Sequence, residues 1–296
     1  MGKEFYDNFP VARQVFEEAS DALSMRIDRL CFTGPESDLK KTENTQPAVL
    51  ATSVAALKAL ESETGARPVV TAGHSLGEYS ALVCANALDL DVAVKLVRNR
   101  GRFMQEAAPE GAGAMAAVIG LEDAAVEELV EEVSTSTGRV VVTANYNSPG
   151  QVVISGHADA VEAVADRAKD RGAKKVVFLN VSAPFHSPLM KPAAERLAER
   201  LAEASFSEAN VPVISNVDAC TYKESEKARE LLEQQVCAPV MWTQSMSKLR
   251  EYDVELAIEI GPGKVLAGLL RKIDKDIQCI PVGDIEGLKQ AATSGI

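Results

Sequence analysis

The sequence has little of what several classes of protein require. It holds three histidines and one tryptophan, and its five cysteines, at positions 31, 84, 220, 237 and 279, lack the close pairing of a zinc site or redox motif. No apolar run reaches the roughly eighteen residues of a membrane span, and the N-terminus has no signal-peptide pattern. We therefore expect a cytoplasmic protein with reduced thiols and without a metal or a membrane partner.

Basic residues are also in the minority. The 31 lysines and arginines against 43 acidic residues give a formal net charge of −12. This balance argues against nucleic acid as a partner, because phosphate binding needs a basic surface. An anionic substrate would need a local positive pocket, so individual arginines matter more than the total charge.

What is present is a chain of 296 residues that alternates helical and strand patterns. Helices are expected over residues 11–30 and from Thr45, with Pro47 in its first turn, and strands near residues 68–73, 211–217 and 255–260. Residues 113–182 show the order β-α-β-β-α-β of the ferredoxin-like motif. We expect an α/β protein whose large α/β-hydrolase-like domain, residues 1–112 and 183–296, has a mainly parallel sheet and carries an inserted ferredoxin-like small domain, residues 113–182.

The stretch Gly73-His74-Ser75-Leu76-Gly77 has the G-x-S-x-G pattern and lies between a predicted strand and a predicted helix. A serine on such a sharp turn needs small neighbours, here Gly73 and Gly77, and presents its hydroxyl as a nucleophile. The next backbone N–H, that of Leu76, then faces a developing oxyanion. The alternative is a glycine-rich turn whose serine only caps a helix.

A serine nucleophile needs a base, usually histidine, and elimination among the three histidines selects one. His74 directly precedes the serine, so its side chain should leave the turn in another direction. His157 lies between a strand and a helix, at the expected surface. His186 remains, in a proline-containing loop where the chain re-enters the large domain. A structural loop histidine is the alternative.

Arg100 falls on the apolar half of a helix predicted over residues 90–108, whereas Arg98 and Arg102 lie on the polar half. Guanidinium does not deprotonate in proteins, so an inward arginine requires an anion, and its planar fork suits a carboxylate. That anion is either an internal Asp or Glu or the carboxylate of an acyl substrate.

The combined motifs resemble the malonyl-CoA:acyl carrier protein transacylases of bacterial type II fatty-acid synthesis. The resemblance covers essentially the whole chain and rests on five segments in order: Gly73-His74-Ser75-Leu76-Gly77-Glu78-Tyr79-Ser80, Arg100-Gly101-Arg102-Phe103-Met104, Asn147-Ser148-Pro149-Gly150-Gln151, Ala183-Pro184-Phe185-His186 and Gly261-Pro262-Gly263-Lys264-Val265-Leu266.

The resemblance implies that Ser75 takes malonyl from coenzyme A, with His186 as base and then acid, and that Arg100 grips the malonyl carboxylate. The acyl group then passes to the phosphopantetheine thiol of acyl carrier protein. It also implies that the backbone carbonyl of Gln235 orients the histidine and that Leu76 and Phe185 are malonyl-selective variants.

We further expect substrate contacts from His74, Asn147 and Phe185, no cofactor beyond the coenzyme A thioester, and a monomer. Exposed lysines are candidates for contacts with carrier protein or coenzyme A phosphates: Lys174, Lys175, Lys191 and Lys264.

The resemblance also implies an apolar strand and a Phe-Pro-Gly-Gln-Gly-Ser-Gln loop, which supplies a second oxyanion N–H, before the segment that begins at Met1 here. We expect a reading frame that starts upstream, rather than a shortened paralogue with weak or no activity that binds coenzyme A or carrier protein. A thioesterase or esterase with the same serine turn is the other alternative.

Overall fold

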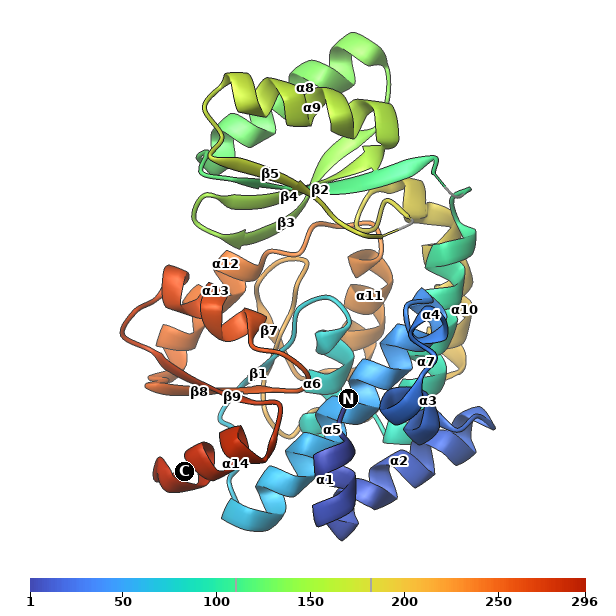
Figure 1. The fold of residues 1–296 in the computed structure, drawn as a ribbon, viewed down its shortest axis with the longest axis vertical. Coiled ribbons are helices and arrows are strands. Elements are labelled where there is room, and N and C mark those ends of the chain that lie inside the picture. Colours follow the sequence, from blue (N-terminus) through green and yellow to red (C-terminus); the bar gives the residue numbers. More distant parts are fainter. Residues whose placement is uncertain (110, 182) are drawn as a thin grey trace.

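The chain folds into two stacked parts, the upper and lower halves of Figure 1. The computed structural model describes residues 1–109, 111–181 and 183–296. The smaller part holds a four-stranded sheet, with helices on the face that points away from the rest of the molecule. The larger part holds both ends of the chain, most of the helices and two small sheets. The protein is therefore of mixed α/β type.

The smaller part has the element order that the sequence predicts, with boundaries shifted by a few residues. Its strands pair antiparallel in the order β3-β4-β2-β5, and the apolar sides of both helices form one core with the sheet. The elements are β2 (Gly113–Ile119), α8 (Asp123–Thr137), β3 (Val141–Ser148), β4 (Gln151–His157), α9 (Ala158–Asp170) and β5 (Lys175–Phe178).

The N-terminal region is more broken than predicted. The expected helix over residues 11–30 is wrong as a single element, because Ser24 adopts a left-handed φ of +49° and ends the helix. The observed helices are α1 (Lys3–Asn8), α2 (Pro10–Leu23), α3 (Ile27–Thr33) and α4 (Glu36–Leu39). The buried apolar residues of α1, α2 and α3 belong to the larger core, and all four helices contact the long helix that follows.

That long helix, α5 (Thr42–Thr64), begins before Thr45, so the predicted start is wrong and Pro47 lies inside the helix rather than in its first turn. The Thr45 hydroxyl donates to two carbonyl oxygens just before the helix, Leu39 O at 2.5 Å and Lys41 O at 3.1 Å. Residues on all sides of α5 are buried, since it packs against α2, α6, α7 and α14. The helix therefore forms the centre of the larger core.

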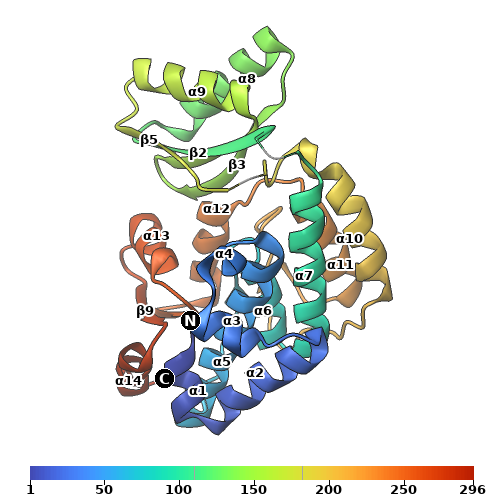
Figure 2. The same ribbon diagram turned by 45° about the vertical axis from the view of Figure 1, so that its right-hand side comes forward.

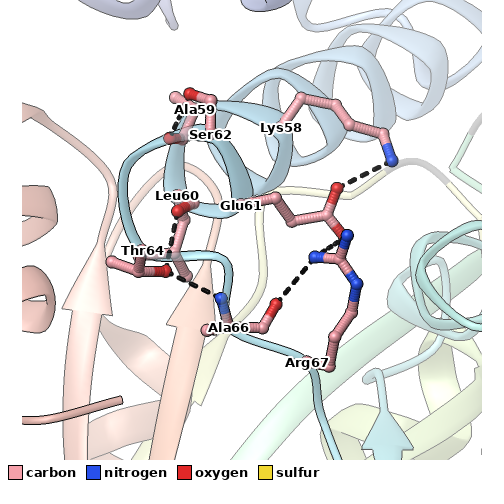
Figure 3. A network of polar contacts seen from close by, with 8 residues as sticks. All are labelled: Lys58, Ala59, Leu60, Glu61, Ser62, Thr64, Ala66 and Arg67. Atoms are coloured by element: carbon pink, nitrogen blue, oxygen red, sulfur yellow. Dashed lines mark hydrogen bonds and ion pairs between the residues drawn. The ribbon is translucent and has the colours of Figure 1, made fainter.

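The C-terminal end of α5 is fixed by a small polar network (Figure 3). The helix stops at Gly65, which has a left-handed φ of +68° that glycine adopts without strain. Glu61 bridges Lys58 at 2.9 Å and Arg67 at 3.5 Å across this turn. These contacts lie at the turn where the chain leaves α5 toward the first strand.

The sheets of the larger part are smaller than expected. Strand β1 (Thr71–Ala72) pairs parallel with β6 (Val213–Ile214), which pairs antiparallel with β7 (Thr221–Tyr222). Strands β8 (Leu256–Ile260) and β9 (Gln278–Val282) form a separate parallel pair. Two of the three strand pairings among the described residues of this part are parallel, as expected, but the strands form two small sheets instead of one. One reason is that Gly73 O, just beyond β1, accepts from the Asn216 side chain instead of from a strand.

The described residues of the larger part also form seven further α-helices. Figure 2 shows α7 and α10 side by side along one edge. The helices are α6 (Gly77–Cys84), α7 (Leu90–Glu106), α10 (Lys191–Glu203), α11 (Ser225–Gln235), α12 (Trp242–Ser247), α13 (Val265–Ile273) and α14 (Ile285–Thr293). Among the described residues, none of the helices combines the length and apolar character needed to cross a bilayer.

Backbone hydrogen bonds join the two parts. The Tyr146 N–H of β3 donates to Val240 O at 2.9 Å, and the Val240 N–H donates to Ala144 O at 2.9 Å. The Thr243 hydroxyl adds a bond to Tyr146 O at 3.0 Å. The smaller part is thus anchored directly on the segment between α11 and α12.

Candidate active site

Ser75 lies in the tight turn between β1 and α6, with a left-handed φ of +51°. Such an angle is uncommon for a residue with a side chain and stores strain. Asn216 holds the turn, because its Oδ1 accepts the Ser75 N–H at 2.6 Å and its Nδ2 donates to Gly73 O at 2.8 Å. The same geometry points the serine hydroxyl away from the backbone bonds, toward the other side chains of the site.

The two glycines of the motif differ in importance. A Cβ on Gly73 would lie 1.9 Å from Gly77 O, so this position requires glycine. A Cβ on Gly77 would meet no atom within 4 Å. The expectation that the turn needs a small residue at both positions is therefore correct only for Gly73.

His186 is the histidine that the fold brings to Ser75, with its Nε2 2.8 Å from the serine Oγ. It is buried, and its Nδ1 lies 2.8 Å from Gln235 O and 3.2 Å from Ala238 O. Carbonyl oxygens only accept, so Nδ1 carries a proton and, in the neutral ring, Nε2 is left to accept from the serine hydroxyl.

The pKa of His186 favours this neutral ring. Burial, together with the nearby charge of Arg100, lowers the pKa to about 3. The imidazole is therefore an unprotonated acceptor at neutral pH, as a general base must be.

Arg100 points from α7 into the same site and is almost completely buried. Its Nη2 donates to Ser75 Oγ at 3.0 Å and to Gln235 Oε1 at 3.0 Å, and its Nη1 donates to Gln46 Oε1 at 2.9 Å. No carboxylate of the described residues lies within the 4.0 Å of an ion pair with this guanidinium. A direct ion pair with an internal Asp or Glu is thus excluded over that part of the chain, although the buried Glu78 carboxyl acts on Arg100 at longer range.

Burial lowers the pKa of Arg100, although a guanidinium keeps its charge in proteins. A buried cation surrounded by neutral acceptors retains a strong attraction for an anion, because burial weakens its hydration and the bonds to neutral groups are weaker than those to a carboxylate. The place next to Ser75 Oγ is therefore suited to a negatively charged acyl group.

The Leu76 N–H lies at the start of α6 and donates to no acceptor among the described residues. The first N–H groups of a helix have no partner within the helix, and the helix dipole adds positive potential there. This free donor immediately after the serine fits a developing oxyanion.

Three polar residues of the site escaped the sequence analysis. Gln46 holds Arg100, Asn216 holds the Ser75 turn, and Glu78 bonds to the Gln235 side chain at 2.7 Å. All three are buried. Only weak signals in the sequence marked them. Gln46 is a polar residue within an apolar helix, Asn216 comes just after a strand, and Glu78 directly follows the serine motif.

His74 leaves the turn in another direction, as expected. Its Nε2 lies 2.8 Å from Asn147 Oδ1 on β3, its ring packs against Trp242, and burial lowers its pKa. Phe185 is half-buried and packs against the sheet of the smaller part. The three residues expected to contact substrate therefore lie where the two parts of the protein meet, and substrate contact remains a prediction.

The other predicted positions lie apart from the Ser75 site. His157 is half-buried at the start of α9, and its Nδ1 accepts the Val140 N–H at 3.0 Å. The four lysines are exposed as expected: Lys174, Lys175, Lys191 and Lys264. Within residues 1–109, 111–181 and 183–296 there is no group of three His, Cys, Asp or Glu side chains arranged to hold a metal ion.

The fold and the site have the features of an acyl transferase, and comparison with known proteins gives the same class. A family model described as the acyl transferase domain matches residues 1–292. The chain is 47% identical over 291 residues to the malonyl CoA-acyl carrier protein transacylase of Bacillus subtilis strain 168, covering 98% of this chain and 91% of the relative. It is 48% identical over 266 residues to the transacylase of Escherichia coli K12, covering 90% and 85%.

Solved structures agree. The transacylase of Coxiella burnetii superimposes with a TM-score of 0.95 at 42% identity, covering 99% of this chain and 92% of that one. A malonyl-transacylase in complex with a type II PKS acyl-carrier protein gives a TM-score of 0.95 at 44% identity, covering 99% and 94%. The chain therefore belongs to the malonyl CoA-acyl carrier protein transacylase family.

Proposed function

We propose that this protein transfers the malonyl group of malonyl-CoA to the phosphopantetheine thiol of acyl carrier protein, through a malonyl ester on Ser75, and so supplies fatty-acid synthesis. The observation that carries the proposal is Arg100, a buried cation with neutral partners that donates to the Ser75 Oγ. The relatives' names and the solved carrier-protein complex support the same substrates.

In the proposed first half-reaction, His186 removes the Ser75 proton while the serine oxygen attacks the thioester carbonyl. The Leu76 N–H stabilises the resulting oxyanion, and the Gln235 carbonyl stabilises the protonated imidazole through Nδ1. The carbon–sulfur bond then breaks, and His186 returns the proton to the coenzyme A thiolate. Throughout, Arg100 binds the malonyl carboxylate with two hydrogen bonds.

The second half-reaction runs the same steps in reverse. His186 deprotonates the phosphopantetheine thiol, the thiolate attacks the Ser75 ester, and the serine recovers its proton. His74, Asn147 and Phe185 are proposed to line the substrate, since they meet at the boundary between the two parts.

Several finer features belong to this proposal. We assign residues 113–182 to a ferredoxin-like small domain inserted into an α/β-hydrolase-like large domain made of residues 1–112 and 183–296, which the strand order β3-β4-β2-β5 supports. We further propose that the protein works as a cytoplasmic monomer without a cofactor.

The thioesterase alternative is not favoured. The relatives, which match nearly the whole chain, are named as transacylases. A carboxylate-binding arginine also favours acyl groups that carry a free carboxylate, such as malonyl. A pure binding protein would have no use for a base in hydrogen-bonding position at a strained serine.

The test is to incubate the protein with labelled malonyl-CoA and carrier protein. We expect label on the carrier protein and, without it, a malonyl adduct seen by intact-mass spectrometry. The adduct should be lost in Ser75→Ala and kept in Ser80→Ala, a control on the helix that follows Ser75. Free malonate without malonyl-carrier protein would show a hydrolase instead.

A further inference from the structure

Glu78 is a fully buried carboxyl in the first turn of α6, three residues after Ser75. It accepts three hydrogen bonds. Oε2 accepts from the Gln235 Nε2 at 2.7 Å and from the Asn216 N–H at 3.1 Å, and Oε1 accepts from the Tyr222 hydroxyl at 2.9 Å. The donors come from three separate segments of the larger part, so the carboxyl joins α6, α11 and the β6–β7 region.

Two of these donors hold the acyl-transfer site. Asn216 fixes the serine turn through its side chain, by accepting the Ser75 N–H and donating to Gly73 O. Gln235 fixes the partners of the serine, because its backbone oxygen accepts from His186 and its side-chain oxygen accepts from Arg100. Each connection between Glu78 and the reacting atoms therefore passes through one intermediate residue.

Hydrogen bonds fix which end of the Gln235 side-chain amide faces Arg100. Its amide nitrogen donates to both Glu78 Oε2 and Ser75 O, so its oxygen must face Arg100. If the carboxyl were absent, one reason for this orientation would be lost. A flipped amide would then place an N–H donor against a guanidinium that also only donates.

The ionised form of Glu78 suits these surroundings. Neither the Asn216 N–H nor the Gln235 amide N–H is able to accept a proton, and a carboxylate accepts at both oxygens. Burial nevertheless raises the pKa to about 7, against the lowering effect of the three hydrogen bonds. A carboxyl kept in the interior at this energetic cost is unusual for a residue that only fills space.

We propose that Glu78 is a positioning residue of the acyl-transfer reaction, whose carboxylate fixes Asn216 and Gln235 and thereby sets the geometry of Ser75, His186 and Arg100. It touches neither substrate nor the reacting atoms. This role rests on the proposed function, because the rate of malonyl transfer is the quantity that the test measures.

The test compares Glu78→Gln, Glu78→Asp and Glu78→Ala with the wild-type chain. Glutamine keeps the shape and an acceptor oxygen, aspartate keeps the charge but is one methylene too short, and alanine removes every contact. Asp28→Asn is the control, because Asp28 is a buried carboxyl on α3 that pairs with Arg26, away from the site. Single-turnover formation of the malonyl–Ser75 ester is followed by rapid quench and intact-mass spectrometry.

The rate constant and the amplitude separate positioning from folding. We expect Glu78→Ala and Glu78→Asp to lower the rate constant about 10- to 100-fold, the effect of losing one or two hydrogen bonds to a charged group. Glu78→Gln should stay within about tenfold of wild type, and Asp28→Asn should change only stability. The preference for malonyl over acetyl should fall along with the rate constant.

A structural role would instead lower the amplitude, the fraction of protein that reacts, and leave the rate constant and the acyl preference unchanged. That outcome in Glu78→Asp and Glu78→Ala overturns the proposal. If alanine abolishes folding, equal rate constants for wild type, Glu78→Gln and Glu78→Asp overturn it in the same way. Failure of the wild-type chain to form an ester contradicts the proposed function itself and is seen separately.

Discussion

Replacement of Arg100 by alanine gives the sharpest test of the acyl specificity. The guanidinium is buried and bonds only to the neutral groups Gln46, Ser75 and Gln235 among the described residues. Two hydrogen bonds to a substrate carboxylate, each about 1.5–3 kcal/mol, would contribute about 3–6 kcal/mol. At about 1.4 kcal/mol per tenfold in rate, Arg100→Ala should lower kcat/KM for malonyl-CoA by about 10²- to 10⁴-fold.

Acetyl-CoA provides the internal reference, because it is smaller and has no free carboxylate. Loss of the bond from Arg100 to Ser75 Oγ, and the exposure of Gln46 and Gln235 acceptors, affect both substrates. These effects cancel in the ratio of the two kcat/KM values, which isolates the contribution of the carboxylate. Arg102→Ala is the matched control, since Arg102 is an exposed arginine on the same helix.

The assay measures acyl transfer from each coenzyme A ester to carrier protein at several concentrations. We expect the malonyl-to-acetyl ratio to fall by about the full 10²- to 10⁴-fold in Arg100→Ala and to remain unchanged in Arg102→Ala. An equal loss for both substrates would refute the reasoning, because it would show that Arg100 only supports the structure of the serine turn.

Further predictions concern the serine turn and its base. Gly73→Ala should prevent correct folding of the turn and abolish the malonyl adduct, whereas Gly77→Ala should fold normally by circular dichroism. Asn216→Ala should slow formation of the Ser75 ester about 10-fold or more, since it frees the serine N–H and Gly73 O, and an unchanged single-turnover rate would contradict this. The lowered pKa of His186 means that the unfolded chain, with a pKa near 6.5, binds a proton that the folded chain does not, so its contribution to stability falls as the pH drops below about 6.5. Between pH 7.5 and 5, urea unfolding should show the wild type losing about 2 kcal/mol more than His186→Ala, and equal losses would contradict the assignment.

Much of the site was predictable because its parts are local. The position of Ser75 between a strand and a helix depends on a few neighbouring residues, and the inward direction of Arg100 follows from the period of its own helix. Residues 113–182 were also predictable in element order, since alternating apolar residues mark strands over short distances.

Predictions failed where contacts with distant residues decide where a helix or strand begins and ends. The helix expected over residues 11–30 breaks at Ser24, and the expected single sheet divides into short pieces that serve the turns. The period of apolar residues along the sequence does not reveal such breaks, because they depend on which distant residues pack against the helix or strand.

The sequence by itself picked out Ser75, His186 and Arg100 as the candidate nucleophile, base and carboxylate-binding residue, through a local motif, elimination among three histidines and the period of one helix. Only the tertiary structure decided how they are held. The bonds from Arg100 to Gln46, from Ser75 to Asn216 and from Gln235 to Ser75 span 54, 141 and 160 residues. Buried polar groups must find partners wherever the fold supplies them, and a one-dimensional pattern does not encode which distant residue arrives there.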